Sequence, residues 1–167
     1  MPPEERVYST AEVARWIGVH PSRVIQMDNE GIVSPSVKRK SGAPRAFTEN
    51  DVIAMVLREE AIEKRLNPYP PSVDELVAMV QRGKPEEMQR AEIRVYQRDL
   101  GFGVFVWVRD TKDKTIKTEI ARWQKEQGAT LLHTQNLLDT VELHREALRA
   151  GIRDRLAYRP PFDEQEN

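Results

Sequence analysis

The segment 8–22 constrains the fold of this chain most strongly, because it encodes two short helices joined by a tight turn. Ser9 and Glu12 have the spacing of a capping box, in which each side chain satisfies the backbone amide of the other residue. Gly18 provides the left-handed residue that commonly ends a helix, and Pro21 suits the first turn of the next helix. The segment therefore predicts a helix-turn-helix.

A basic loop and a third helix follow this unit. The stretch 32–47 contains four basic and no acidic side chains, namely Lys38, Arg39, Lys40 and Arg45. Thr48 and Asp51 repeat the capping spacing and open a helix with an apolar face over 52–57. Two helices, a basic hairpin and a further helix, in this order, predict a winged helix-turn-helix.

A series of short motifs occurs in a recognisable order. They are Tyr8-Ser9, Glu12-Val13-Ala14-Arg15, Gly18-Val19, Pro21-Ser22, Gly31-Ile32, Pro35, Ser41-Gly42, Arg45, Phe47-Thr48 and Asp51. Over residues 7–82 this series resembles the N-terminal domain of the MerR family of transcription regulators. The resemblance implies a dimeric regulator that places a recognition helix in the major groove and a wing on the phosphates. It also implies distortion of a promoter spacer, with RNA polymerase as a further partner at the promoter.

The recognition helix departs from the family pattern. Where the family commonly has Leu-Arg-Tyr-Tyr-Glu, this chain has Val24-Ile25-Gln26-Met27-Asp28, and His20 replaces the usual capping serine. The usual arginine and tyrosine contribute phosphate and groove contacts, so the family's standard operator sequence is not expected here.

The expected DNA-binding residues fall on the helix 20–30 and on the wing. They are His20, Ser22, Arg23, Gln26, Lys38, Arg39, Lys40 and Arg45. Gln26 is able to pair in a bidentate manner with adenine, and Arg23 is the cation of this helix. The wing cations are expected to contact flanking phosphates. The resemblance singles out Arg45, which matches the family's wing arginine.

The C-terminal half is predicted to continue as helices around one short hairpin. Expected are a helix from Ser72 to Gly83, a helix over 85–100, a β-hairpin over 102–118 and a long helix over 119–150. The long helix is predicted to carry a dimerisation stripe of Leu131, Leu138, Val141 and Leu148. The fold class is thus mainly α, with a DNA-binding domain at 1–83, a dimerisation or effector region at 84–157 and a disordered tail at 158–167.

The aromatic residues of the hairpin region allow three interpretations. Tyr96, Phe102, Phe105, Trp107 and Trp123 lie close together in the sequence and could form a core, line a ligand pocket or face a protein partner. Core packing is preferred, because a two-stranded hairpin is marginal in water and needs large anchoring side chains. Since both strand faces are apolar, one face is expected to meet the chain's own helices and the other face the dimer mate.

Composition limits the classes of function. The chain has 167 residues, a net charge of −1 and no cysteine, which excludes disulfides and thiolate metal sites. No apolar stretch or leader points to a membrane, so a cytoplasmic protein is expected. The sequence lacks a phosphate-binding glycine loop and a thiol nucleophile, so we expect no enzyme, no metal and no cofactor.

Two other functions remain open from the sequence. An excisionase uses the same kind of winged domain to bend DNA during recombination, whereas an adaptor would use the aromatic hairpin to bind a protein such as RNA polymerase. Phased, repeated binding sites would favour the excisionase, and a palindrome that overlaps a promoter would favour the regulator. Co-purification of a partner without DNA affinity would favour the adaptor.

Overall fold

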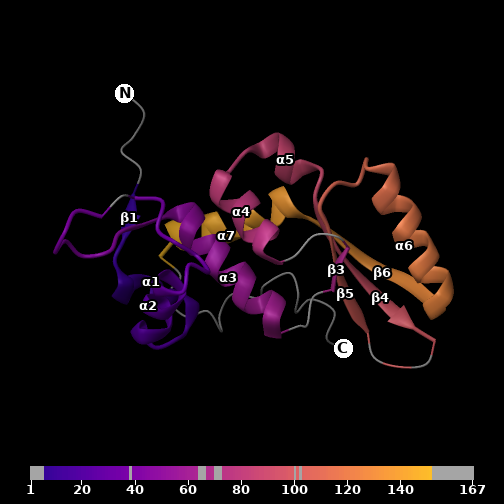
Figure 1. Cartoon of the computed structure of the whole chain (residues 1–167), viewed down its shortest axis with the longest axis horizontal. Coiled ribbons are helices and arrows are strands. Elements are labelled where there is room, and N and C mark those ends of the chain that lie inside the picture. The colour runs from indigo at the N-terminus through magenta and orange to yellow at the C-terminus, as the bar shows by residue number, and fades with distance from the viewer. Residues whose placement is uncertain are drawn as a thin grey trace.

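The computed structural model describes residues 6–37, 39–63, 67–69, 73–99, 101 and 103–151. The fold of this part of the chain is mixed and rich in helix (Figure 1). Its elements in chain order are β1 (Val7–Tyr8), α1 (Thr10–Ile17), α2 (Pro21–Asn29), β2 (Phe47–Thr48), α3 (Glu49–Glu63), β3 (Asn67–Tyr69), α4 (Val73–Arg82), α5 (Pro85–Gln89), β4 (Glu92–Arg98), β5 (Val104–Val108), α6 (Lys114–Gln127), β6 (Ala129–Asn136) and α7 (Leu137–Arg149).

The first two helices begin and end where local signals place them. Ser9 Oγ accepts a hydrogen bond from the Glu12 amide and Glu12 Oε1 accepts one from the Ser9 amide, both at 3.1 Å. Gly18 ends α1 with φ of 84°. His20 caps α2, because its Nδ1 accepts from the Ser22 amide at 3.1 Å. The predicted pair of helices with a tight turn is therefore confirmed.

The third helix is also confirmed, but the hairpin before it is not. Thr48 Oγ1 accepts from the Asp51 amide at 3.1 Å, and Asp51 Oδ2 accepts from the Thr48 amide at 3.0 Å. Residues 31–37 and 39–46 form a loop without strand pairing, and Lys38 lies outside the described residues. Pro35 and Pro44 lack the amide that a ladder needs. The loop is instead attached to α3, because the Ser36 amide donates to Asp51 Oδ2 at 2.8 Å.

The predicted helix over 85–100 is wrong in its second half. Its first turn forms α5, which ends at Gln89, and the chain then enters strand β4. Within β4, Ile93 and Val95 alternate with the more exposed Glu92 and Arg94, which is the two-residue period of a strand.

The predicted hairpin has a different second strand. β5 pairs antiparallel with β4, with Glu92 opposite Val108 and Tyr96 opposite Val104. The segment 115–118, expected as the return strand, belongs to helix α6. Asp113 caps this helix, because its Oδ1 accepts from the Thr115 amide at 2.9 Å.

The predicted long helix over 119–150 is wrong as well. α6 stops at Gly128, which has φ of 56°, and strand β6 follows before α7 begins. Asn136 starts α7 as its N-cap, with Oδ1 accepting from the Asp139 amide at 3.2 Å. A left-handed glycine and an asparagine cap are stop and start signals, and together they outweigh the apolar repeat that spans them.

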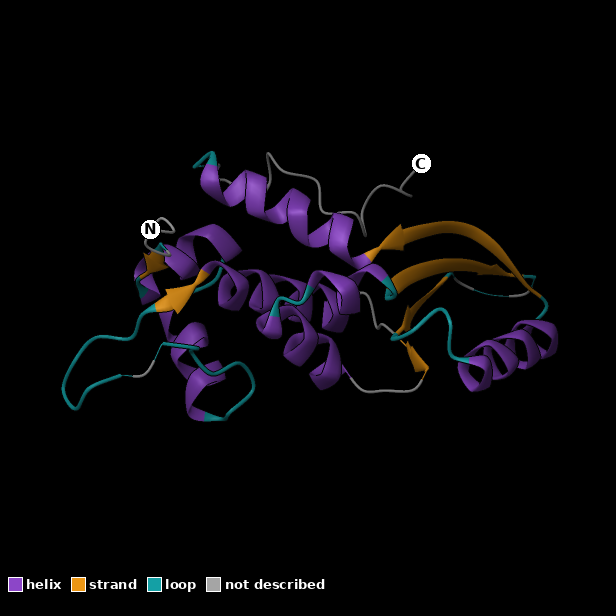
Figure 2. Cartoon of the chain, turned by 90° about the horizontal axis from the view of Figure 1, so that it is seen from above, coloured by secondary structure: helices purple, strands orange, loops and turns teal. Residues whose placement is uncertain are grey.

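The larger sheet has the strand order β3-β5-β4-β6. β3 runs parallel to β5, and the other neighbours are antiparallel. β5 and β6 are therefore parallel to each other, with β4 between them. Because α6 connects these two strands, β5-α6-β6 forms a split βαβ unit. Figures 1 and 2 show α6 beside this sheet at one end of the molecule, and α7 returning from β6 toward α1 at the other end.

One hydrophobic core joins the two halves of the chain. It contains residues of α1, α2, α3, α4 and α7 together with Ile93 and Trp107 of the sheet. Arg149 of α7 contributes a two-pronged ion pair to Glu49 of α3, with both N–O distances at 2.8 Å. The domain boundary expected at residue 83 thus lies within a continuous core. The tail 158–167 lies outside the described residues.

Both faces of β5 are covered by the chain's own helices. Val104, Val106 and Val108 pack with Ile116 and Ile120 of α6 in a second cluster. On the opposite face, Trp107 is fully buried in the main core. The expectation that a dimer mate covers one face of this strand is therefore wrong.

The aromatic residues of this region act mainly as core. Tyr96 and Trp107 are buried, and Trp123 contacts Tyr96 edge to face with ring centroids 5.1 Å apart. Phe105 is half-buried against the main core, and Phe102 lies outside the described residues. The preferred interpretation of these residues as core is thus confirmed for the described ones. In the described part of the chain, no helix has the length and apolarity needed to cross a bilayer.

Candidate nucleic-acid interface

The outer face of α2 consists of polar side chains. Val24 and Met27 are buried beneath the helix, which turns His20, Ser22 and Gln26 toward solvent. The predicted contact residues of this helix therefore lie on one exposed face. His20 and Ser22 also interact with each other, because His20 Nδ1 lies 2.8 Å from Ser22 Oγ.

Arg23 connects this face to the helix behind it. Its Nη2 donates to Glu59 Oε1 of α3 at 2.9 Å, and its Nη1 donates to Gln26 Oε1 at 3.1 Å. Gln26 Nε2 in turn donates to Glu30 Oε1 at 3.1 Å. This series of hydrogen bonds, from Glu59 through Arg23 and Gln26 to Glu30, fixes the orientation of the Gln26 amide in the unbound protein. Both ends of the series are acidic residues, so Arg23 attracts a phosphate less strongly than an unpaired arginine would.

Arg45 lies against the end of α2. Its Nε donates to Asp28 Oδ2 at 2.6 Å, and its Nη2 donates to Asn29 Oδ1 at 2.9 Å. Only 18% of the Arg45 side chain is exposed. The side chain therefore anchors the basic loop to the helix, whereas the resemblance implied a phosphate contact.

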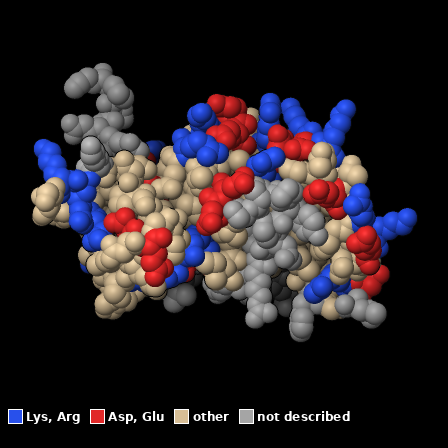
Figure 3. All heavy atoms as spheres, viewed as in Figure 1, with Lys and Arg blue, Asp and Glu red and all other residues tan. Residues whose placement is uncertain are grey.

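Arg39 and Lys40 are the exposed cations of the described loop. In Figure 3, basic side chains gather along the edge of the molecule that Figure 1 assigns to the loop between α2 and α3. A groove of about 310 Å³ separates the loop from the end of α2. Its lining comprises Asp28, Asn29, Ser34, Pro35, Val37, Arg39, Arg45 and Ala46.

Two members of this interface escaped the sequence analysis. Asp28 and Glu59 pair with Arg45 and Arg23 across 17 and 36 residues of chain. One signal could have identified Asp28, because an acid in the last turn of a helix opposes the helix dipole and is stabilised by a nearby cation. Nothing in the sequence indicated Glu59, which belongs to another helix.

The predicted dimerisation stripe is dispersed in the structure. Leu131 lies on β6 with 44% of its surface exposed, whereas Val141 and Leu148 are buried in the chain's own core. Leu138 is partly buried against the same core. These four residues share one face only on a continuous helix, and the strand β6 removes that continuity.

The described residues contain no group of three metal-ligating side chains close enough to hold an ion. Neither a family model nor a curated protein matches this chain.

Proposed function

We propose that this chain is a sequence-specific DNA-binding transcription regulator with a winged helix-turn-helix of MerR type. One observation carries the proposal: an exposed polar helix face lies beside a loop of exposed cations, and Arg45 connects the two. Nine helical residues at about 1.5 Å each give α2 a length of about 13 Å. An α-helix is about 10–12 Å in diameter with its side chains, so it enters a major groove that is about 12 Å wide.

In this proposal the residues have different tasks. Gln26 reads a base, and its existing hydrogen bonds to Arg23 and Glu30 hold its amide in place beforehand. Arg39 and Lys40, with Lys38, contact phosphates and make binding depend on salt. Arg45 acts through Asp28 by fixing the position of the loop, so its loss weakens binding by loosening the wing.

The regulator is proposed to act as a homodimer, with β6 in place of the missing helix as the contact surface. β6 is an edge strand of eight residues without any Asp, Glu, Lys or Arg, and such charges commonly protect edges from pairing. Leu131 and Leu132 expose 44% and 55% of their surface on this strand. A second copy fits this edge because an uncharged strand meets no like charges when it pairs antiparallel with itself.

Binding to a genomic fragment library, followed by fluorescence anisotropy on the selected duplex, tests the DNA proposal. Lys40→Gln should lower affinity on all sequences and reduce the salt slope by about one unit for each subunit bound. The exposed Lys84, which lies outside the interface, provides the matched control Lys84→Gln. Gln26→Ala should relax preference at one base position, whereas Gln127→Ala on α6 should not. If the wild-type protein shows no salt-sensitive binding to any fragment, the proposal is wrong.

Light scattering tests the dimer separately. The wild-type protein should have twice the monomer mass, and Leu132→Lys should shift it toward the monomer. Leu143→Lys is the control, because Leu143 is similarly exposed on α7 but lies outside β6. A monomeric wild-type protein, or equal effects of the two variants, would contradict pairing through β6.

A further inference from the structure

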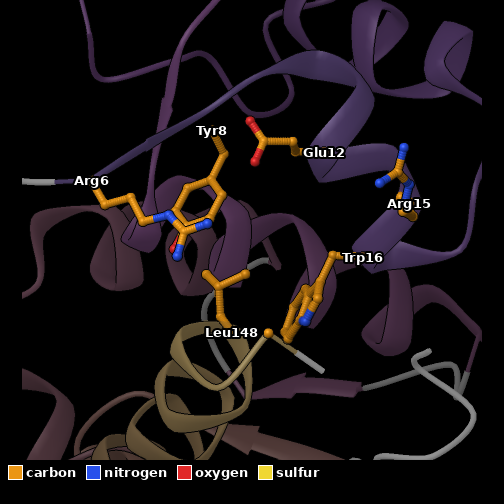
Figure 4. Close-up of a pocket in the computed structure, with 7 residues that line it drawn as sticks. Arg6, Tyr8, Glu12, Arg15, Trp16 and Leu148 are labelled. Atoms are coloured by element: carbon orange, nitrogen blue, oxygen red, sulfur yellow. The ribbon is translucent and has the colours of Figure 1, made fainter. Parts of the chain in front are cut away.

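A pocket distinct from the DNA interface lies between β1, α1 and the end of α7. Its volume is about 120 Å³, and its lining consists of Arg6, Tyr8, Glu12, Arg15, Trp16, Leu148 and Gly151. In Figure 4 the Tyr8 ring extends toward Leu148, with Arg6 beside it and Trp16 across from it. We call it the Tyr8 pocket.

The hydroxyl of Tyr8 is a buried polar atom without a partner. Tyr8 exposes 4% of its surface, and its hydroxyl forms no hydrogen bond within the described structure. Burial raises the pKa of this phenol, so the group stays protonated and remains a donor at neutral pH. Unpaired buried donors are rare because they cost free energy. A ligand acceptor in the pocket would remove this cost.

The charges around the pocket favour an anion. The guanidinium carbon of Arg6 lies 4.8 Å from the centre of the Tyr8 ring, and Arg15 is exposed on α1. Neither arginine forms an ion pair within the described structure. The carboxylate of Glu12 already accepts the Ser9 amide as part of the capping box. Among the lining residues two cations thus face one engaged carboxylate, and the nearby ion pair of Arg149 with Glu49 adds no net charge.

The remaining wall is apolar and rigid. Trp16 and Leu148 are both buried, and the Trp16 ring contacts the His144 ring edge to face at 6.2 Å between centroids. Since His144 is itself fully buried on α7, this contact holds the indole in place. A flat apolar group is therefore accommodated next to Trp16, while an anionic group faces the arginines.

We propose that the Tyr8 pocket binds a small aromatic carboxylate with a single six-membered ring. The pocket of about 120 Å³ is somewhat smaller than the cavity of about 150 Å³ that holds benzene in a well-studied engineered case, so it takes at most one such ring, and because it opens to solvent part of the ligand extends beyond it. The carboxylate would accept from the Tyr8 hydroxyl and pair with Arg15 and Arg6. Charge-assisted hydrogen bonds of this kind are the stronger ones.

Titration of the full-length protein with benzoate, followed by calorimetry, tests this proposal without DNA. Saturable one-to-one binding is expected, and both benzyl alcohol and acetate should bind far more weakly. Arg15→Gln and Tyr8→Phe should each weaken benzoate binding roughly tenfold. Arg90→Gln is the matched control, because Arg90 is exposed and does not line the pocket.

A second readout places the ligand. In a spectrum of the tryptophan indole protons, benzoate should shift the Trp16 signal and leave those of Trp107 and Trp123 unchanged. Absence of saturation, equal weakening by Arg15→Gln and Arg90→Gln, or a shift of all three signals would overturn the proposal. Because no DNA enters these measurements, their failure would leave the proposed DNA binding intact.

Discussion

Replacement of Trp107 by alanine tests whether the two halves of the chain share one core. Trp107 is fully buried on β5 opposite Ile93, and it packs into the cluster that contains α1, α3 and α7. Truncation of a buried tryptophan to alanine costs about 3–5 kcal/mol. The indole Nε1 of Trp107 has no hydrogen-bond partner among the described residues, and its removal relieves part of that cost. We therefore expect the lower end, about 3 kcal/mol.

The assay is thermal unfolding followed by circular dichroism and calorimetry. For a protein of this size, 1 kcal/mol lowers Tm by about 2–4 °C, so Trp107→Ala should lower it by about 6–12 °C. Because the core is continuous, the loss should appear as a downward shift of one cooperative transition. Trp123→Ala is the control with a smaller expected effect, because Trp123 is only half-buried beside the second cluster.

Two results would refute this reasoning. An unchanged Tm would show that Trp107 does not pack as described. Two separate transitions, of which Trp107→Ala lowers only one, would show that residues 1–83 and 84–157 unfold as independent domains.

Three further substitutions test individual contacts. Arg45→Ala should destabilise the protein by about 1–2 kcal/mol, because it leaves the half-buried Asp28 without its cation. A double-mutant cycle with Asp28→Asn, followed by urea unfolding, measures the coupling energy between the two side chains. A coupling energy of zero would contradict the ion pair. Hydrogen bonds from Arg82 lower the pKa of Glu87. Glu87→Gln should thus cost under about 1 kcal/mol at neutral pH, and the difference from wild type should vanish as the pH falls below 4.5 through the lowered pKa. Tyr8→Phe should preserve or raise the free energy of unfolding at neutral pH, because it removes an unpaired buried hydroxyl. Because burial raises the pKa of Tyr8, the phenol ionises at lower pH in the unfolded chain than in the folded protein. The wild-type protein should therefore lose more stability above pH 10.0 than Tyr8→Phe does. An equal loss of stability in the two proteins, measured by urea titration, would contradict this.

The N-terminal helices could be predicted because their signals are local. Ser9 and Glu12 satisfy each other's amides, and Gly18 ends the helix in a conformation that glycine adopts at little cost. Thr48 and Asp51 act in the same way for α3. Each signal involves residues at most a few positions apart, so the sequence by itself determined these boundaries.

The C-terminal half could not be predicted in the same way, because an apolar repeat is ambiguous between a helix and a strand followed by a helix. Leu131 and Leu138 fit one helical stripe in sequence, yet the first lies on β6 and the second on α7. Pairing with β4 decides the difference, since it satisfies the backbone of residues 129–136 through a segment more than thirty positions away.

The interface and the Tyr8 pocket were likewise decided by tertiary structure. The loop between α2 and α3 could be predicted as basic from composition, but the ion pair of its Arg45 with Asp28 is seen only in the folded structure. The pocket joins Tyr8 and Trp16 to Leu148 from the opposite end of the described chain. Local sequence specified the helices and their caps, whereas the partners of each charged or aromatic side chain depended on packing between distant segments, because such contacts exist only once the chain has folded.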